Sequence, residues 1–273
     1  GHTIQHILQA WPQPQLRLYV GCYRNDPDTI EAASRSAHHD PRVRIVIHER
    51  DGPTTKADCL NRLFEAVCDD ELRQGRRFKM VVFHDAEDMV DPAALALLDR
   101  SIACEGSPGV DFVQLPVEPL PQTGRDWLGS HYCEEFAEDH AKTMVARDAL
   151  GAAVPSAGVG CAVSRRALDW LEQRHGHAKP FATASITEDY ELGLVIAQLG
   201  GRGRFLRCKD ERGRLIATRA YFPSALGQIV RQKSRWIHGI SLQGWDRVGW
   251  SKSTVENWMR QRDRRGPFAA LVL

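Results

Sequence analysis

The stretch Phe78-Lys79-Met80-Val81-Val82-Phe83-His84-Asp85-Ala86-Glu87-Asp88 decides the fold class of this chain. Residues 80–83 are apolar at every position, which is typical of a strand covered by helices on both faces of its sheet. An acidic cluster follows at once. Open α/β sheets bind ligands just outside the carboxyl ends of their strands. The stretch therefore predicts a buried strand that delivers carboxylates to a binding site.

Apolar runs alternate with helical patterns on both sides of this stretch. We expect further strands at Leu16–Tyr23, Val43–His48 and Val110–Val117, and helices at Asp28–Ala37, Lys56–Cys68 and Pro92–Glu105. The alternation is typical of βαβ units and predicts an α/β fold with a mostly parallel sheet sandwiched by helices. We find no internal repeat or flexible linker in the 273 residues, which indicates one domain.

The second half of the chain has longer helical patterns. We expect helices at Tyr132–Asp148, Asp189–Leu199 and Ser224–Trp245, and short strands at Gly203–Cys208 and Leu215–Tyr221. Residues 156–166 read as a glycine turn, a short apolar strand and a helix start. Thr187 is a plausible N-cap for the second helix, and Gly200-Gly201 is a stop signal for it.

Composition excludes some functions. The 36 basic and 35 acidic residues give a net charge of +1, so the chain lacks the basic excess of nucleic-acid-binding proteins. The seven cysteines are odd in number and form no Cys-x-x-Cys pair. Zinc binding and a disulfide framework are therefore disfavoured, and a reducing, cytosolic-side environment is expected.

The acidic cluster has the spacing of a metal site. Asp85 and Glu87 are two residues apart and can present oxygens to one hard divalent cation, Mg²⁺ or Mn²⁺, which bridges and neutralises a diphosphate. Asp88 is a competing candidate ligand. Taken alone, the cluster could also be an acidic exit from a strand that binds nothing.

The motif Gln232-Lys233-Ser234-Arg235-Trp236 lies on the last predicted helix. Arg235 can pair with diphosphate oxygens in a planar, bidentate way, and Trp236 offers a flat apolar face to a sugar ring. Gln232 lies one turn earlier on the same side. The alternative is an amphipathic helix that packs on a partner or on a membrane surface, which the nearby Trp245 and Trp250 fit.

The chain contains three motifs in a fixed order: residues 85–88, Thr187-Glu188-Asp189 and residues 232–236. In these motifs and their order it resembles the membrane-bound, inverting family 2 glycosyltransferases. The resemblance implies a GT-A fold in which Asp85 and Glu87 replace the family's Asp-x-Asp metal motif. It also implies that Asp189 is the catalytic base of a direct displacement. A helix N-terminus keeps Asp189 ionised and makes it a weaker base, so positioning must supply much of the rate.

Two further segments resemble parts of this family. Lys56-Ala57-Asp58-Cys59-Leu60-Asn61 is similar to a stretch near the nucleotide, which implies that Lys56 meets phosphate and Asp58 the base or ribose. The alternative is an ordinary N-capped helix. Gly158-Val159-Gly160 is similar to the floor of the acceptor site. The resemblance thus assigns the donor to Lys56, Asp58 and Arg235, and the acceptor to Gly158, Gly160, Glu188, Gln232 and Trp236.

Residues 20–27, 52–58, 84–88 and 231–236 look most like the glycosyltransferase domain of NfrB-like proteins, bacterial inner-membrane glycosyltransferases named for a role in phage adsorption. This resemblance implies a domain that faces the cytoplasm at the inner membrane. It implies a UDP-linked hexose or N-acetylhexosamine as donor and a growing polysaccharide or a lipid-linked acceptor. It also implies membrane lipid and an outer-membrane export partner as contacts, with no nucleic acid.

The two ends of the chain suggest a fragment. The family opens with a strand, whereas Ile4–Trp11 reads as the helix after it, so we expect a glycosyltransferase domain at 1–250 that lacks its first strand. Residues 251–273 carry a basic cluster at 260–265 and then an apolar run. We expect interfacial helices near this end and a juxtamembrane basic segment that leads into a truncated membrane helix; a frayed tail is the alternative.

Two other function classes stay open. A non-catalytic scaffold, such as a phage-receptor component of an exopolysaccharide secretion complex, would keep the fold without the chemistry; Glu87 and the missing strand favour it. A nucleotidyltransferase would share the nucleotide-binding sheet but would not need the Gln-x-x-Arg-Trp helix.

Overall fold

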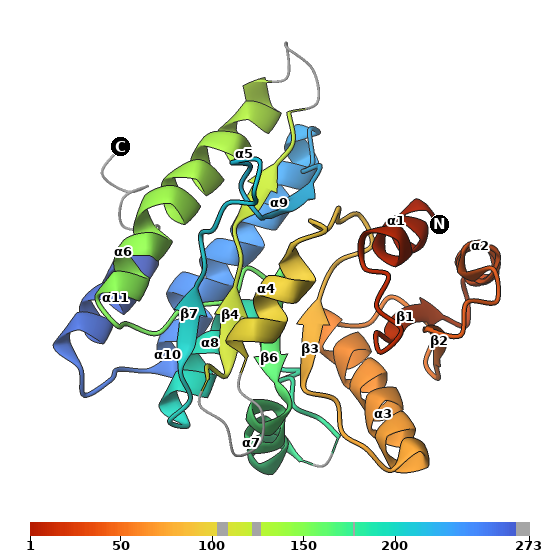
Figure 1. Cartoon of the computed structure of the whole chain (residues 1–273). Coiled ribbons are helices and arrows are strands. Elements are labelled where there is room, and N and C mark those ends of the chain that lie inside the picture. Colours follow the sequence, from red (N-terminus) through yellow and green to blue (C-terminus); the bar gives the residue numbers. More distant parts are fainter. Residues whose placement is uncertain (103–108, 122–126, 177, 266–273) are drawn as a thin grey trace.

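A four-stranded sheet with the order β3-β6-β4-β7 lies at the centre of the molecule (Figure 1). The computed structural model describes residues 1–102, 109–121, 127–176 and 178–265. The central strands are β3 (Met80–Phe83), β6 (Cys161–Ser164), β4 (Phe112–Gln114) and β7 (Gly203–Phe205). Strand β6 runs antiparallel to β3 and to β4, whereas β4 and β7 are parallel.

Two parallel strand pairs complete the β-structure. They are β1 (Leu18–Tyr23) with β2 (Val43–His48), and β5 (Val117–Pro119) with β8 (Thr218–Ala220). Three of the five pairings are thus parallel and two antiparallel. The predicted α/β class is confirmed, and the antiparallel β6 is the departure from a parallel sheet. The single strand expected at Val110–Val117 is interrupted after Gln114, near Pro116, which has no N–H to donate to a ladder.

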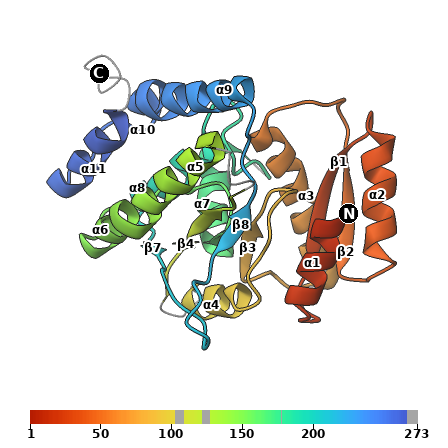
Figure 2. The same ribbon diagram turned by 90° about the horizontal axis from the view of Figure 1, so that it is seen from above.

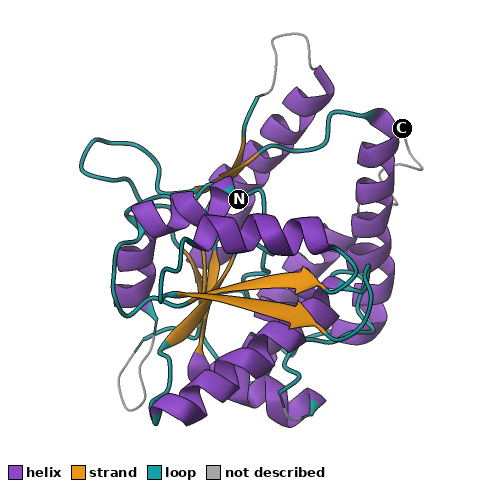
Figure 3. Ribbon diagram, turned by 90° about the vertical axis from the view of Figure 1, so that its right-hand side faces the viewer, coloured by secondary structure: helices purple, strands orange, loops and turns teal. Residues whose placement is uncertain are grey.

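Successive strand residues point to opposite faces, so each central strand serves two cores. On one face Val82, Val113 and Ala162 pack with Leu98 of α4 (Ala94–Ser101) and with Trp11. On the other face, the alternate strand residues pack against three helices: α3 (Lys56–Gln74), α7 (Arg165–His175) and α8 (Glu188–Gln198). Figure 3 shows helices on both sides of the strands. The unbroken apolar run of residues 80–83 is explained by this double coverage.

Helix α1 (His2–Ala10) is part of the folded body. With α2 (Pro27–Ala37) it packs on the β1–β2 pair through a small core that contains Ile4, Ala33 and Val43. At its end, the Trp11 indole Nε1 donates to the carbonyl of Asp91 at 3.0 Å. The helix predicted at Ile4–Trp11 is therefore present and buried on one side.

Two long helices form the other end of the molecule, and each contains a π-helical stretch. The first comprises α5 (Trp127–Glu138), η1 (Asp139–Thr143) and α6 (Met144–Ala149); the second comprises α9 (Leu226–Trp236), η2 (Ile237–Gln243) and α10 (Gly244–Val248). They match the helices expected at Tyr132–Asp148 and Ser224–Trp245, although hydrophobic spacing did not predict the π stretches. Figure 2 shows α5 and α9 on the same side of the sheet. The Tyr132 hydroxyl joins them by donating to Gln232 Oε1 at 2.6 Å.

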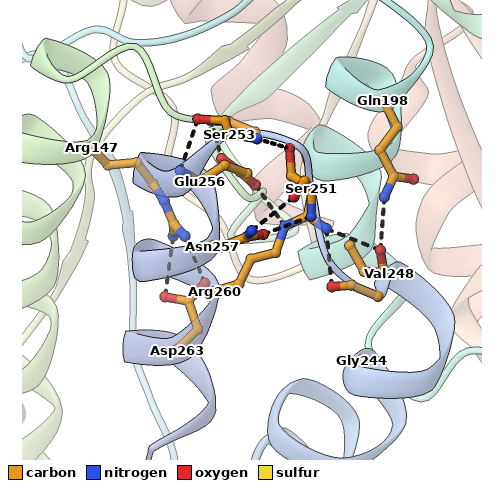
Figure 4. A network of polar contacts seen from close by, with 12 residues as sticks. Arg147, Gln198, Gly244, Val248, Ser251, Ser253, Glu256, Asn257, Arg260 and Asp263 are labelled. Atoms are coloured by element: carbon orange, nitrogen blue, oxygen red, sulfur yellow. Dashed lines mark hydrogen bonds and ion pairs between the residues drawn. The ribbon is translucent and has the colours of Figure 1, made fainter.

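The last described helix, α11 (Thr254–Arg264), is held by buried charges (Figure 4). Arg260 and Arg264 are each 2% exposed, and Arg260 Nε donates to Glu256 Oε1 at 2.8 Å. The described part of the basic cluster at 260–265 therefore does not form a uniformly solvated flank, and the fold continues past the boundary expected at residue 250. The apolar run after residue 267 lies outside the described residues. Within the described part of the chain, no helix combines the length and apolarity needed to cross a membrane.

Candidate functional site

A cleft of about 1040 Å³ opens beyond the carboxyl end of β3 and brings the three motifs together. Its walls contain Asp85 and Glu87 from the turn after β3, Thr187, Glu188 and Asp189 from the start of α8, Gln232, Arg235 and Trp236 from α9, and Lys56 from the start of α3. Ligand sites of open α/β sheets are expected at this end of the strands. The cleft is therefore the candidate active site.

Hydrogen bonds within the acidic turn after β3 hold it in shape. Asp88 is 2% exposed, and its Oδ2 accepts from the backbone N–H of Asp85 at 2.8 Å and lies 3.1 Å from His84 Nδ1. Asp88 thus holds the turn, which leaves Asp85 and Glu87 as the pair that can bind a cation. Burial, and next the charge of Asp85, raises the pKa of Glu87 above its ordinary value. Such a raised pKa is expected where two carboxylates share a partly buried site.

Lys56 is the cation that stands among these carboxylates. Thr55 caps α3 by accepting from the Asp58 backbone N–H at 3.2 Å, and this start places Lys56 in the cleft. Its Nζ lies 2.7 Å from Asp85 Oδ1 and 3.4 Å from the carbonyl oxygen of Gly158. Burial lowers the pKa of Lys56, but the charges of Asp85, Asp189 and Glu188 together outweigh burial and raise that pKa. Lys56 therefore stays charged in the cleft.

Asp189 lies in the first turn of α8, where its Oδ1 accepts from the Tyr190 backbone N–H at 2.8 Å. Gly158 has φ +81°, and a Cβ there would stand 2.6 Å from Asp189 Oδ2, so only glycine fits beside this carboxylate. Burial raises the pKa of Asp189, against the opposing charges of Lys56 and Arg235. The expectation that the helix N-terminus makes Asp189 a weak base was wrong, because desolvation is the larger effect.

The neighbouring residues of this motif also depart from expectation. Burial, followed by the charge of Asp189, raises the pKa of Glu188 to about 7. Thr187 stands at the N-cap position, but its side chain makes no capping hydrogen bond. It is 3% exposed and instead packs against Gly239 of η2, where a Cβ would lie 2.9 Å from Thr187 Cβ and closer still to Oγ1 and Cγ2.

Helix α9 presents the Gln-x-x-Arg-Trp motif from the opposite wall. Gln232 is tied to α5 through Tyr132, and the Trp236 ring meets the rings of Tyr132 and Phe136 edge-on, at centroid distances of 6.2 and 6.3 Å. Arg235 is exposed to the cleft, and no described residue forms an ion pair or hydrogen bond with its guanidinium. Its charge nonetheless acts on Asp189 and Glu188. Arg235 is thus available to an anionic ligand.

A set of contacts fixes this wall relative to Asp189. The Gln243 side chain accepts from the Ile186 backbone N–H at 2.7 Å and donates to the Ala184 carbonyl at 2.9 Å. Four residues earlier, Gly239 packs on Thr187. One helical turn beyond, Arg247 forms an ion pair with the buried Glu191 at 2.7 Å. The π-helical η2 therefore holds α9 against the segment that carries Asp189, in keeping with the frequent use of π segments at functional sites.

Asp58 and Gly160 are not among the residues that line the cleft. Asp58 Oδ2 lies 3.2 Å from His48 Nε2, and its other oxygen pairs with Arg50, so the structure groups it with β2 outside the cleft lining. Its contact with a nucleotide stays a prediction. Gly160 is buried at φ +63°, with its backbone bonded to Phe83 and Leu115. Gly160 makes the tight turn into β6, and its assignment to the acceptor floor stays a prediction.

Several cleft residues escaped the motif analysis. Phe136 and Phe222 line the cleft beside Trp236, with ring centroids 4.9 Å apart, and Tyr132 lies 4.9 Å from Phe222. They form an aromatic wall next to the Gln-x-x-Arg-Trp motif. The four-residue spacing of Tyr132 and Phe136 on one helix face was a usable signal. Nothing in the sequence linked either residue to Phe222.

The fold and the site define a GT-A glycosyltransferase. Residues 1–239 match the model of the family described as "Glycosyltransferase like family 2", and the chain belongs to that family. It is similar to the mannosyltransferase PcManGT from Pyrobaculum calidifontis, solved in complex with GDP-Man and Mn²⁺: the TM-score is 0.66 and the identity 17%, over 97% of this chain and 64% of that one. This likeness confirms the predicted fold.

More particular relatives are phage adsorption proteins. The chain is 35% identical over 271 residues to "Bacteriophage adsorption protein B" of Escherichia coli (strain K12), and equally to "Bacteriophage N4 adsorption protein B" of Escherichia coli O157:H7. Each match covers 93% of this chain and 36% of the relative. The chain thus spans about a third of the length of these curated relatives, and the predicted resemblance to NfrB-like proteins is confirmed.

Proposed function

We propose that this domain transfers a sugar, with inversion, from a UDP-linked hexose or N-acetylhexosamine to a growing polysaccharide or lipid-linked acceptor. One observation carries the proposal: a single cleft brings together the carboxylates of Asp85, Glu87 and Asp189 and the guanidinium of Arg235, which has no partner among the described residues. These are the groups that such a transfer needs for the diphosphate, for the acceptor proton and for the leaving group.

The acidic turn fits a divalent cation. Within the described residues, no group of three or more His, Cys, Asp or Glu side chains is close enough to hold a metal by itself. Asp85 and Glu87 would supply two oxygen ligands, and substrate phosphates and water the others, which is the usual arrangement for Mg²⁺. Burial and the neighbouring charge of Asp85 raise the pKa of Glu87, so a cation held between the two carboxylates would be favoured electrostatically. When bound, Mg²⁺ or Mn²⁺ would neutralise the diphosphate as it leaves.

Asp189 acts as the general base. It takes the proton from the acceptor hydroxyl while that oxygen attacks the anomeric carbon, and the bond to the nucleoside diphosphate breaks. Its raised pKa makes it a better proton acceptor than an ordinary aspartate, provided that it is ionised at the working pH. Gly158 leaves its Oδ2 side free of a Cβ, so the carboxylate can reach the cleft.

The remaining cleft residues divide between donor and acceptor. The charges of Lys56 and Arg235 both act on Asp189, and we assign these two cations to the diphosphate, where their charge counters the charge of the leaving group. Trp236, with the aromatic wall behind it, offers a flat surface to a sugar ring of the acceptor. Gln232 and Glu188 also line the cleft, and we assign their polar groups to the acceptor.

Exposed apolar side chains support a location at a membrane surface. On the helix α9–η2–α10 and after it, the large apolar residues left in solvent are Leu226, Val230, Ile237, Leu242, Trp245 and Trp250. Trp258 of α11 is 58% exposed. Tryptophan and aliphatic residues gathered along an amphipathic helix are typical of interfacial helices. We therefore place the domain at the cytoplasmic face of the bacterial inner membrane, and we propose a role in phage adsorption through the polysaccharide or its export partner.

The test is UDP release by the complete protein in membranes, with a panel of UDP-sugars and Mn²⁺ or Mg²⁺. Asp189→Asn should abolish metal-dependent release with the preferred sugar. Asp28→Asn is the matched control, because Asp28 is an exposed acid in the first turn of α2 and far from the cleft motifs in the chain. Release that survives Asp189→Asn would remove Asp189 as the base.

The same assay separates the alternatives. No release by the wild-type protein with any sugar would favour the non-catalytic scaffold. Pyrophosphate in place of UDP would favour a nucleotidyltransferase.

A further inference from the structure

Helix α11, which lies beyond the 239 residues matched by the family model, contacts the body through charged side chains. Glu256 Oε2 accepts from the Ala153 backbone N–H at 2.8 Å, and Arg260 Nη1 donates to the carbonyls of Val248 and Gly249 at 3.0 and 3.1 Å (Figure 4). Glu256 and Arg260 thus pair with each other and with backbone groups of the body, and satisfied buried polar contacts of this kind rigidify a packing arrangement. The helix is therefore docked in a defined register.

One residue of α11 reaches the helix that carries the catalytic base. Asp263 accepts from Arg147 Nη2 at 2.7 Å and from the Tyr190 hydroxyl at 2.7 Å. Tyr190 is 6% exposed and follows Asp189 directly, and its backbone N–H donates to Asp189 Oδ1 at 2.8 Å. A continuous chain of contacts thus runs from α11 through one tyrosine to the Asp189 carboxylate.

The geometry points to Asp263 as a positioning residue for Asp189, an inference that rests on the proposed function. By holding the Tyr190 phenol, Asp263 fixes the first turn of α8 and the direction in which the Asp189 carboxylate enters the cleft. Arg147, which is 1% exposed, neutralises Asp263 and keeps it in place. The segment after residue 250 is therefore part of the catalytic apparatus, and displacement of α11 would lower the rate of transfer.

Tyr190→Phe is the sharpest variant, because it removes one hydroxyl and leaves the Arg147–Asp263 pair intact. We expect kcat at saturating donor and acceptor to fall about tenfold, since a small misplacement of a catalytic group is costly, while KM for the donor stays within about twofold. The matched control is Tyr19→Phe. The Tyr19 hydroxyl also donates to a carboxylate, Asp70 Oδ2 at 2.9 Å, but from β1 and outside the cleft lining. Tyr19→Phe should leave kcat unchanged.

A double-mutant cycle tests whether the Tyr190–Asp263 contact carries the effect. Asp263→Asn alone should also lower kcat, and the double variant should be little worse than the more damaged single one. Additive losses would mean that the two residues act separately, for example by touching the acceptor, and would overturn the inference. A rise in KM for the acceptor with kcat unchanged would overturn it as well.

Hydrogen exchange gives a readout that does not depend on activity. The amides of Tyr190 and Glu191, which donate to Asp189 Oδ1 and to the Thr187 carbonyl, should exchange faster in Tyr190→Phe and Asp263→Asn than in the wild-type protein or in Tyr19→Phe. Unchanged exchange at these amides would refute the positioning role even if the protein proved inactive. A wild-type protein that shows the expected exchange but releases no UDP would instead refute the proposed function.

Discussion

Gly239→Ala should separate the two walls of the cleft. The added Cβ would stand 2.9 Å from Thr187 Cβ and closer still to Oγ1 and Cγ2, whereas carbon atoms pack best at about 3.5–4.0 Å. Thr187 is buried and Gly239 lies in η2, so relief of the contact with Thr187 Cβ alone requires the helix to move by roughly 0.6–1 Å, and relief of the closer contact with Cγ2 requires more. Arg235 and Trp236 lie three to four residues before Gly239 and move with it. A displacement of about 1 Å can cost on the order of 100-fold in rate.

The assay is UDP release at saturating donor and acceptor, with thermal unfolding measured in parallel. Overpacking of this kind costs about 1–3 kcal/mol of stability, so the variant should remain folded. Gly227→Ala is the matched control on the same helix, because its Cβ would meet only Arg231 Nη1, at 4.0 Å. Thr187→Ala in the Gly239→Ala background removes two of the three clashing atoms and should restore part of the rate. A folded Gly239→Ala variant with wild-type kcat would refute the reasoning.

Two further predictions concern charge. Asp85→Asn should raise the Mn²⁺ concentration needed for half-maximal UDP release by about 100-fold or more. The control is Asp99→Asn, because Asp99 is an exposed acid that pairs with Lys79. Equal metal dependence in both variants would contradict the role of Asp85 as a metal ligand. Burial and the charge of Asp263 raise the pKa of Asp139 from 3.8 to about 6. The folded protein therefore binds the proton of the Asp139 carboxyl more tightly than the unfolded chain does, and ionisation of Asp139 opposes folding. Asp139→Asn should therefore raise Tm at about pH 8 and leave it nearly unchanged at about pH 4, and an equal shift at both values would disprove the origin of the effect.

Local patterns were sufficient for most elements of secondary structure. Strand β2 spans Val43–His48 as predicted, and α8 begins and ends within one residue of expectation. The start of α3 at Lys56 was also predicted, and the structure shows that Thr55 caps it. These features depend on side chains a few residues apart in the chain, so the local sequence pattern is enough to predict them.

The direction of β6 could not be predicted. Its residues are apolar in the way of any buried strand, and the antiparallel pairing with β3 and β4 depends on partners far apart in the chain. The same holds for Gly160, whose role is set by Thr218 and by the neighbouring strands rather than by the motif that contains it. Spacing of the kind found in residues 158–160 does not reveal which glycine faces a ligand.

Electrostatics at the site also required the folded structure. The helix start suggested a lowered pKa for Asp189, but burial raises it, and burial is a property of everything packed around the carboxylate. Likewise, a cluster of arginines suggested an exposed basic flank, whereas Arg260 and Arg264 are buried and bonded to backbone carbonyls. Charge alone does not say whether a side chain meets water or a partner.

The sequence by itself determined the family, the α/β class and the chemistry offered by the acidic turn, by the first turn of α8 and by the Gln-x-x-Arg-Trp helix, because each is encoded in residues close together in the chain. Only the tertiary structure decided that Lys56 pairs with Asp85 and that Asp263 reaches Tyr190. These contacts join residues that are 29 and 73 positions apart. The physical reason is that the direction of a side chain and its desolvation are set by the packing of whole elements, which no short stretch of sequence contains.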